Sequence, residues 1–208
     1  MGENHQQVGN SYNNIGVDYE RTKQYEKAIE YYLKSIEVKA KVFGGENHED
    51  VAFGYNNIGN SYGTMKEYEK ALEYKFKALN LRKTIFGNNR KEVASSYDNI
   101  AFTYCDQLNY EKALEYYFMG LSIRKLLFGE NHKEVASSSY ESIIIAYLNS
   151  GENEKALEYC FKSLEIYNKE EDSIGKANCY HNTGLGYERQ KDYQKALESY
   201  LKSLEIRK

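Results

Sequence analysis

The 208-residue chain contains no proline and no tryptophan, and only three cysteines. Three cysteines without a CxxC pair argue against a disulfide framework and fit a reducing, cytoplasmic compartment. No run approaches the roughly 20 apolar residues of a membrane span, and no apolar stretch follows Met1 as in a secretory signal. A formal net charge of −3 gives no electrostatic reason to bind nucleic acid or an anionic membrane. We therefore expect a cytoplasmic protein that contacts neither nucleic acid nor membrane.

Sequence patterns that carry catalysis are also missing. The chain has no GxxxxGK[ST], GxGxxG, HExxH or GxSxG motif. His181 and Cys179 lie close together in sequence but lack further ligands at a spacing suited to zinc. We expect a protein that is not an enzyme and that needs neither a metal nor another cofactor.

What the chain does contain is internal repetition. One string occurs five times, for example as YEKAIEYY from Tyr25 and YEKALEYY from Tyr110. Its alanines are spaced by 43, 42, 43 and 40 residues, at Ala28, Ala71, Ala113, Ala156 and Ala196. A second string, such as YNNIGVDY, begins 16 residues before each alanine, at Tyr12, Tyr55, Tyr97, Tyr140 and Tyr180. The chain is thus five copies of one unit.

Each copy is predicted to form two helices. In the first string, Tyr12, Ile15, Gly16 and Tyr19 lie at i, i+3, i+4 and i+7, which is one face of an α-helix. Residues 28–36 form a similar apolar stripe, and the absence of proline allows long unbroken helices. Because the turns within a copy are short, the two helices of each pair must be antiparallel. We predict five antiparallel helix pairs in a single domain of residues 1–208, with repeats at approximately 5–44, 47–87, 89–129, 131–170 and 172–208.

The ends of the helices are also indicated by particular residues. In the first three repeats a glycine follows the phenylalanine at the expected end of the second helix, where a helix C-terminus favours a left-handed residue, at Gly44, Gly87 and Gly129. Asparagine follows each of these glycines two or three residues later, and we predict it as the N-cap of the next helix, at Asn47, Asn89 and Asn131.

This pattern resembles the tetratricopeptide repeat, and its period of 42–43 residues and the phrases FGENH and YNNIG resemble the kinesin-light-chain-like variety. The resemblance implies an all-α fold, a right-handed superhelical solenoid. It also implies a non-catalytic protein–protein interaction scaffold that binds an extended peptide or a partner helix in its concave groove. The chain lacks the proline that usually follows the loop histidine, and it lacks the heptad coil by which kinesin light chains join the motor. A motor-adaptor role is therefore not carried over.

In that family the first helix of each pair lines the concave groove, so the residues just after its first tyrosine point toward the ligand. A side-chain amide both donates and accepts, so a row of asparagines can hold a peptide backbone whatever its sequence. Asparagine is a poor helix former, and its recurrence in the middle of these helices favours a binding role. The candidate peptide-binding residues are Asn13, Asn14, Asn56, Asn57, Asn60, Asp98, Asn99, Phe102, Glu141, Ser142, His181 and Asn182.

The same positions indicate the chemistry of the ligand. Chaperone-binding members of the family hold a terminal carboxylate with Lys and Arg at these positions, and this chain lacks them. Asp98, Asp106 and Glu141 make the middle of the groove slightly acidic, while Phe53 and Phe102 offer apolar contacts. We expect a neutral to basic, extended peptide.

Two regions leave alternatives open. The fourth copy has an extra residue within residues 137–139 and Ile144 where the other copies have glycine or alanine. This irregularity reflects either relaxed packing or a local change of pitch that shapes a binding site or hinge. The last helix carries Leu197, Leu201 and Leu204 without a polar capping helix after it. Either the chain is part of a longer array, or chains associate end to end through this helix. The alternatives to a binding scaffold are a self-associating structural array and a regulatory domain of a larger signalling protein.

Overall fold

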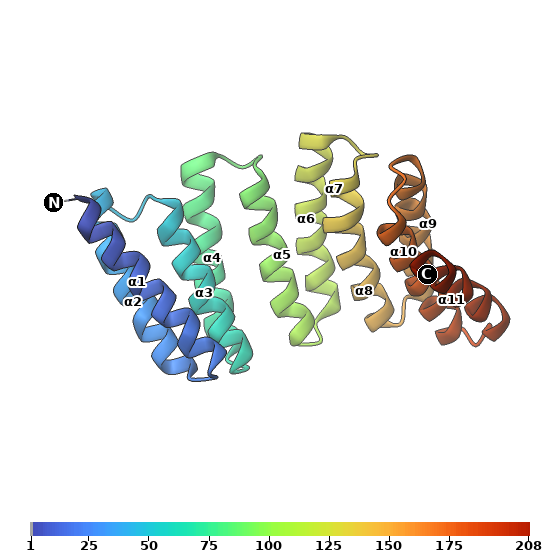
Figure 1. Ribbon diagram of the computed structural model, residues 1–208, viewed down its shortest axis with the longest axis horizontal. Coiled ribbons are helices and arrows are strands. Elements are labelled where there is room, and N and C mark those ends of the chain that lie inside the picture. Colours follow the sequence, from blue (N-terminus) through green and yellow to red (C-terminus); the bar gives the residue numbers. More distant parts are fainter. Residues whose placement is uncertain (1) are drawn as a thin grey trace. The chain divides into compact units, whose positions relative to one another are not determined.

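The computed structural model describes residues 2–208, with side chains from His5 onward, and the described chain contains helices and no strands (Figure 1). It divides into two compact units, unit 1 up to Gln107 and unit 2 from Leu108. The division lies between the two helices of the third repeat, and the single domain predicted from the sequence stays a prediction. Within the described residues, none of the helices is both long enough and apolar enough to cross a membrane.

Unit 1 contains five helices that pack in chain order. They are α1 (Gly2–Arg21), α2 (Tyr25–Phe43), α3 (Glu49–Thr64), α4 (Tyr68–Phe86) and α5 (Lys91–Asp106). Each helix contacts the next one along the chain. The first two predicted helix pairs are confirmed.

Unit 2 contains α6 (Tyr110–Phe128), α7 (Lys133–Val135), η1 (Ala136–Tyr140), α8 (Glu141–Ser150), α9 (Asn153–Lys169), α10 (Ser173–Arg189) and α11 (Tyr193–Arg207). The segments α7, η1 and α8 follow one another without a break, so together they are the first helix of the fourth pair. The segment η1 is a π-helical turn. It contains all three serines of residues 137–139, so the extra residue is absorbed as a wider helical turn.

A hydrophobic cluster in unit 1 joins the first two helix pairs. Ile29 and Ile36 of α2 pack in one cluster with Val51 and Ile58 of α3. Gly16 lies against the ring of Tyr32, where a Cβ atom would come within 2.6 Å of a ring carbon. Gly16 thus allows α1 to approach α2 closely, and the nearest side chain is the ring four residues after Ala28.

The tyrosines form a repeated stack between the two helices of a pair. Tyr31 of α2 lies between Tyr12 and Tyr19 of α1, with ring centroids 6.0 and 5.3 Å apart. The same arrangement recurs around Tyr74 in α4 and Tyr159 in α9. The nine tyrosines of these three stacks are therefore part of the scaffold.

The helix ends agree in part with the glycine prediction and correct the asparagine one. Gly44, Gly87 and Gly129 all have positive φ, but of the three only Gly44 takes the left-handed helical conformation, because ψ is 175° at Gly87 and 157° at Gly129. The N-cap residues are His48, Arg90 and His132, one position after the predicted asparagines. The Nδ1 atoms of His48 and His132 accept hydrogen bonds from the backbone N–H two residues later. Each imidazole also stacks on the phenylalanine that ends the preceding helix, which holds it in the capping position.

Candidate functional site

The predicted binding residues lie on one side of α1, α3 and α5 in unit 1. We call this set the helix-A face, defined as the side chains one, two and five positions after the first tyrosine of each repeat. Ile58 and Gly59, which lie between these positions in α3, are buried. The members of the helix-A face in unit 1 are exposed or half-buried: Asn13, Asn14, Val17, Asn56, Asn57, Asn60, Asp98, Asn99 and Phe102.

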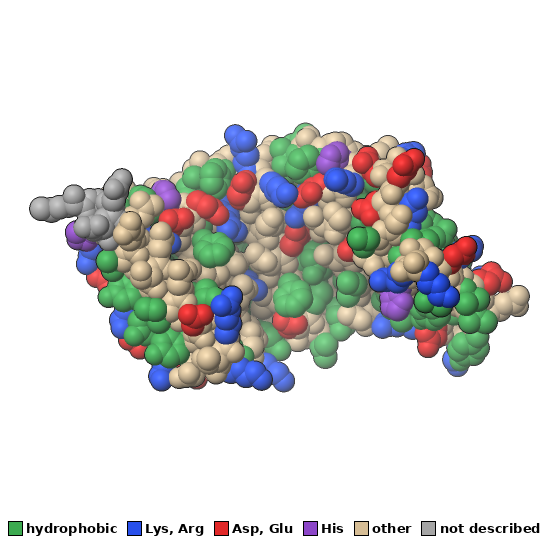
Figure 2. All heavy atoms as spheres, viewed as in Figure 1, with side chains coloured by type: hydrophobic (Ala, Val, Ile, Leu, Met, Phe, Trp, Pro, Cys, Tyr) green, Lys and Arg blue, Asp and Glu red, His purple; other side chains and the backbone are tan. Residues whose placement is uncertain are grey.

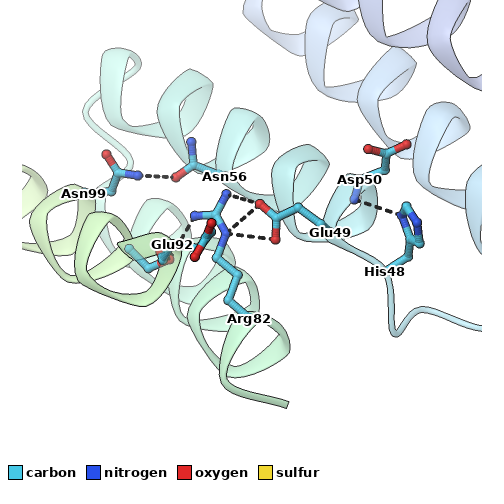
Figure 3. A network of polar contacts seen from close by, with 8 residues as sticks. His48, Glu49, Asp50, Asn56, Arg82, Glu92 and Asn99 are labelled. Carbon is cyan, nitrogen blue, oxygen red and sulfur yellow. Dashed lines mark hydrogen bonds and ion pairs between the residues drawn. The ribbon is translucent and has the colours of Figure 1, made fainter. Parts of the chain in front are cut away.

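The asparagines of neighbouring repeats are paired with each other. The Asn57 amide nitrogen donates to the Asn13 side-chain oxygen at 3.3 Å, and the Asn99 amide nitrogen donates to the Asn56 side-chain oxygen at 2.9 Å. Figure 3 shows the second pair bridging α3 and α5. Each pair leaves one NH₂ group and one carbonyl oxygen for another partner, because every amide has two donor hydrogens and an acceptor oxygen. The amides are thus fixed in orientation without being fully used.

A buried lysine beneath this face was not predicted from the sequence. The Lys75 ammonium donates to the backbone carbonyl of Asn99 at 3.1 Å and to the Thr103 hydroxyl at 2.8 Å. Burial lowers the pKa of Lys75 to about 8, although the nearby Asp106 carboxylate opposes this change. The available signal was positional, because Lys75 stands four residues after the repeat alanine, where Tyr32, Tyr117 and Tyr200 stand in other repeats.

A second unpredicted cation joins three helices of unit 1. The Arg82 guanidinium of α4 binds the Glu49 carboxylate of α3 at 2.9 to 3.3 Å (Figure 3). It also donates to the Ser96 hydroxyl of α5 at 2.9 Å. Its side chain is buried, so the charge is compensated by a bidentate pair rather than by water. This network fixes the spacing of α3 and α5, which carry most of the helix-A face.

Unit 2 differs at the same positions. The Glu141 carboxylate accepts a hydrogen bond from the Tyr167 hydroxyl at 3.0 Å. Burial raises the pKa of Glu141, while hydrogen bonds from Tyr167 and Asn178 act in the opposite direction. Ser142 and Asn182 are half-buried, and the exposed His181 ring lies 5.6 Å from the Tyr200 ring. Glu141 is therefore held by the scaffold, and Tyr167 is its partner.

Charges on the surface are mixed. In Figure 2, basic and acidic side chains alternate over the visible face, with hydrophobic side chains between them. Among the described residues, no group of three or more His, Cys, Asp or Glu side chains is placed to hold a metal ion.

The sequence and the fold were compared with known proteins. A family model described as Tetratricopeptide repeat matches residues 7–84, 50–125 and 134–208. None of the curated proteins matches the sequence.

Several solved structures share the fold. BtubC (BKLC) from P. vanneervenii is 19% identical, with a TM-score of 0.80 over 98% of this chain and 81% of that protein. A P. anserina kinesin light chain protein with nearly identical TPR-like repeats is 16% identical, with a TM-score of 0.79 over 99% and 97% of the two chains. YrrB, described as a TPR protein with an unusual peptide-binding site, is 20% identical, with a TM-score of 0.55 over 94% and 84%. At these identities the likeness concerns the fold.

Proposed function

The chain belongs to the tetratricopeptide repeat family, whose members generally serve as protein–protein interaction scaffolds, and on that premise we propose that the helix-A face of unit 1 binds an extended peptide. The observation that carries this proposal is the pairing of Asn57 with Asn13 and of Asn99 with Asn56. Each pair presents one donor and one acceptor at the surface. A peptide unit offers one N–H and one C=O in return, so its backbone satisfies both.

The surroundings of the pairs favour an apolar or basic ligand. Phe53 and Phe102 are large apolar side chains exposed on the same helices. Asp98 contributes a carboxylate to the face, and residues 53–64 of α3 include no charged residue. The ligand we propose is therefore neutral to basic, with its backbone on the amides and apolar side chains against the two phenylalanines. In unit 2 the residues at the corresponding repeat positions include Ser142, His181 and Asn182.

The test is binding of a library of extended peptides of neutral and basic composition, immobilised on an array. Wild-type protein should retain a subset of the peptides, and Asn57→Ala and Asn99→Ala should each weaken that binding at least tenfold. Asn80→Ala is the matched control, because Asn80 is an exposed asparagine on α4 outside the helix-A face. Unfolding free energy should fall by about 1 kcal/mol in the two site variants, the usual net value of one hydrogen bond.

Equal binding by all four proteins would contradict the proposal, and so would the absence of any retained peptide. A loss of binding in Asn80→Ala as large as that in Asn99→Ala would also contradict it, because the effect would then not belong to this face.

A second proposal is self-association of the chains. The observation in its favour is the exposed apolar face of α11, formed by Leu197, Leu201 and Leu204. A contiguous apolar face of this kind marks an interaction surface. Light scattering over a concentration series tests this proposal, since a constant monomer mass would contradict it.

A further inference from the structure

Because the repeats are equivalent, the burial of a residue in one repeat can be compared with the burial of the matching residue in another. Within unit 1, the second helix of one pair packs on the first helix of the next through four side chains. Ile29 and Ile36 of α2 form one buried cluster with Val51 and Ile58 of α3. Another helix with large aliphatic residues at the same repeat positions can pack in the same way.

At the corresponding positions, α11 is bare. Leu197 and Leu204 occupy the places of Ile29 and Ile36, counted from the repeat alanine. Their side chains are 59% and 49% exposed, whereas those of Ile29 and Ile36 are 7% and 6% exposed. The α11 face is thus the surface that α2 buries, left uncovered.

The helix α1 is exposed at the positions that α3 uses for this packing. Val8 and Ile15 occupy the places of Val51 and Ile58 and are 44% and 38% exposed, whereas the two α3 residues are fully buried. Ser11, also exposed, lies between them. The sequence Val–Ser–Ile at these positions recurs in α5 as Val93, Ser96 and Ile100, all three of which are buried.

We infer that α11 of one chain packs on α1 of a second copy, reproducing between chains the packing of α2 on α3. Leu197 and Leu204 of one copy then lie against Val8 and Ile15 of the next. The inference rests on the second proposal, self-association, and is independent of the helix-A face. Because the two surfaces differ, the contact is heterologous, so more than two chains can join in the same way. The mean mass of the assembly therefore grows with concentration.

The experiment uses two variants, each with one disabled end. Val8→Glu/Ile15→Glu disables α1, and Leu197→Glu/Leu204→Glu disables α11; all four side chains are exposed in the single chain, so folding should be retained, as circular dichroism would verify. Leu126→Glu is the control, because Leu126 is exposed on α6 at a position outside both surfaces.

Mass is measured by light scattering from micromolar to millimolar concentration. Wild type and Leu126→Glu should rise from the monomer mass of 24.2 kDa beyond twice that value. Each double variant alone should stay monomeric, because every junction needs one intact end of each kind. An equimolar mixture of the two should stop at a dimer, since only one junction can form.

Three results would overturn the inference. Wild type that stays monomeric removes self-association itself, without bearing on peptide binding. Wild type that associates together with both double variants places the contact on another surface. A mixture that stays monomeric while wild type associates shows that these two ends are not partners. Asn57→Ala should leave the mass of the assembly unchanged, which separates this surface from the peptide-binding proposal.

Discussion

At the residue scale, the least expected feature is a cation buried without a carboxylate bonded to it. Lys75 is held by a backbone carbonyl and a hydroxyl, and its burial lowers its pKa to about 8, below the ordinary value of 10.5. The folded chain therefore releases this proton at a lower pH than the unfolded chain does. Below pH 8 both states bind the proton, and the cost of burying the charge is fully present.

The contribution of Lys75 to stability should consequently increase as the pH rises from 8 to 10. At this group the unfolded state binds more protons than the folded state in that window, so its contribution to the free energy of unfolding rises by about 2 kcal/mol. Buried thiols act in the opposite direction in the same window, because burial raises the pKa of Cys160 and Cys179 to about 12, and buried phenols such as Tyr55 follow at higher pH. The test is therefore the difference between wild type and Lys75→Met in urea unfolding at pH 7, 8, 9 and 10, which should rise by about 2 kcal/mol. Lys77→Met, a surface change on the same helix, should follow wild type at every pH; a constant difference between wild type and Lys75→Met would show that Lys75 is not the cause.

Sequence reasoning succeeded where a residue repeats and failed where it departs from the repeat. The tyrosine and glycine positions are periodic, so their roles in packing could be predicted. Lys75 and Arg82 stand on the second helices, where a charged residue is usually solvent-facing. Their partners, Thr103 and Glu49, are 28 and 33 residues away, a distance over which helical periodicity gives no information on contacts. The asparagine row was visible in the sequence, but which amide donates to which was not.

At the element scale, the turn inside each helix pair contains a residue in the left-handed region. Lys23, Lys66, Leu108 and Lys191 have φ between 60° and 63°, and in the fourth repeat Gly151 takes a similar value. Only glycine adopts this conformation without a steric penalty of roughly 1–2 kcal/mol. The fourth repeat, irregular elsewhere, thus has the least strained turn.

Lys66→Gly should accordingly stabilise the protein by about 1 kcal/mol, once the larger backbone entropy of glycine in the unfolded chain is deducted. Lys66 is exposed, so the substitution removes little packing. Lys66→Ala retains the strained conformation and is the control, expected to change the free energy of unfolding by less than about 0.5 kcal/mol. Urea unfolding of the three proteins gives the comparison, and a gain in the alanine variant equal to that in the glycine variant would show that strain is not the cause.

The π-helical turn follows from one inserted residue. Residues 91–97 read KEVASSY and residues 133–140 read KEVASSSY. The turn keeps both ends in register, because His132 still caps the segment and Ser139 still meets Arg124, at 3.2 Å, as Ser96 meets Arg82 at 2.9 Å. The sequence located the extra residue, whereas its absorption inside the helix, rather than in the preceding loop, depends on these two fixed contacts.

Deletion of Ser138 should therefore convert residues 133–150 into one continuous α-helix. The shortened segment has the sequence of the α5 start, so Val135 would take the place of the buried Val93. We expect the deletion variant to be at least as stable as wild type, with stronger hydrogen-exchange protection at residues 136–140. A loss of more than about 2 kcal/mol would show instead that the π turn is required for the packing of the fourth repeat.

At the scale of the whole molecule, the division into two compact units predicts that a core substitution lowers hydrogen-exchange protection mainly in its own unit. In a repeat array, each helix is stabilised mainly by the helices beside it, so a local defect spreads over a limited distance. The residues that allow a matched comparison are Ile58 in unit 1 and Ile143 in unit 2. They occupy the same repeat position, and both are fully buried.

Ile58→Ala and Ile143→Ala should each cost about 2–5 kcal/mol, because each leaves a cavity between two helices. Hydrogen exchange in Ile58→Ala should accelerate most in α2, α3 and α4, while α9, α10 and α11 keep their protection. In Ile143→Ala exchange should accelerate most in the helices of unit 2, while those of unit 1 keep their protection. Because both variants make the same substitution at the same repeat position, a difference between their exchange patterns reflects the place of the cavity in the chain. If either variant accelerates exchange equally in all helices, the chain unfolds as one cooperative block, and the division into two units has no energetic counterpart.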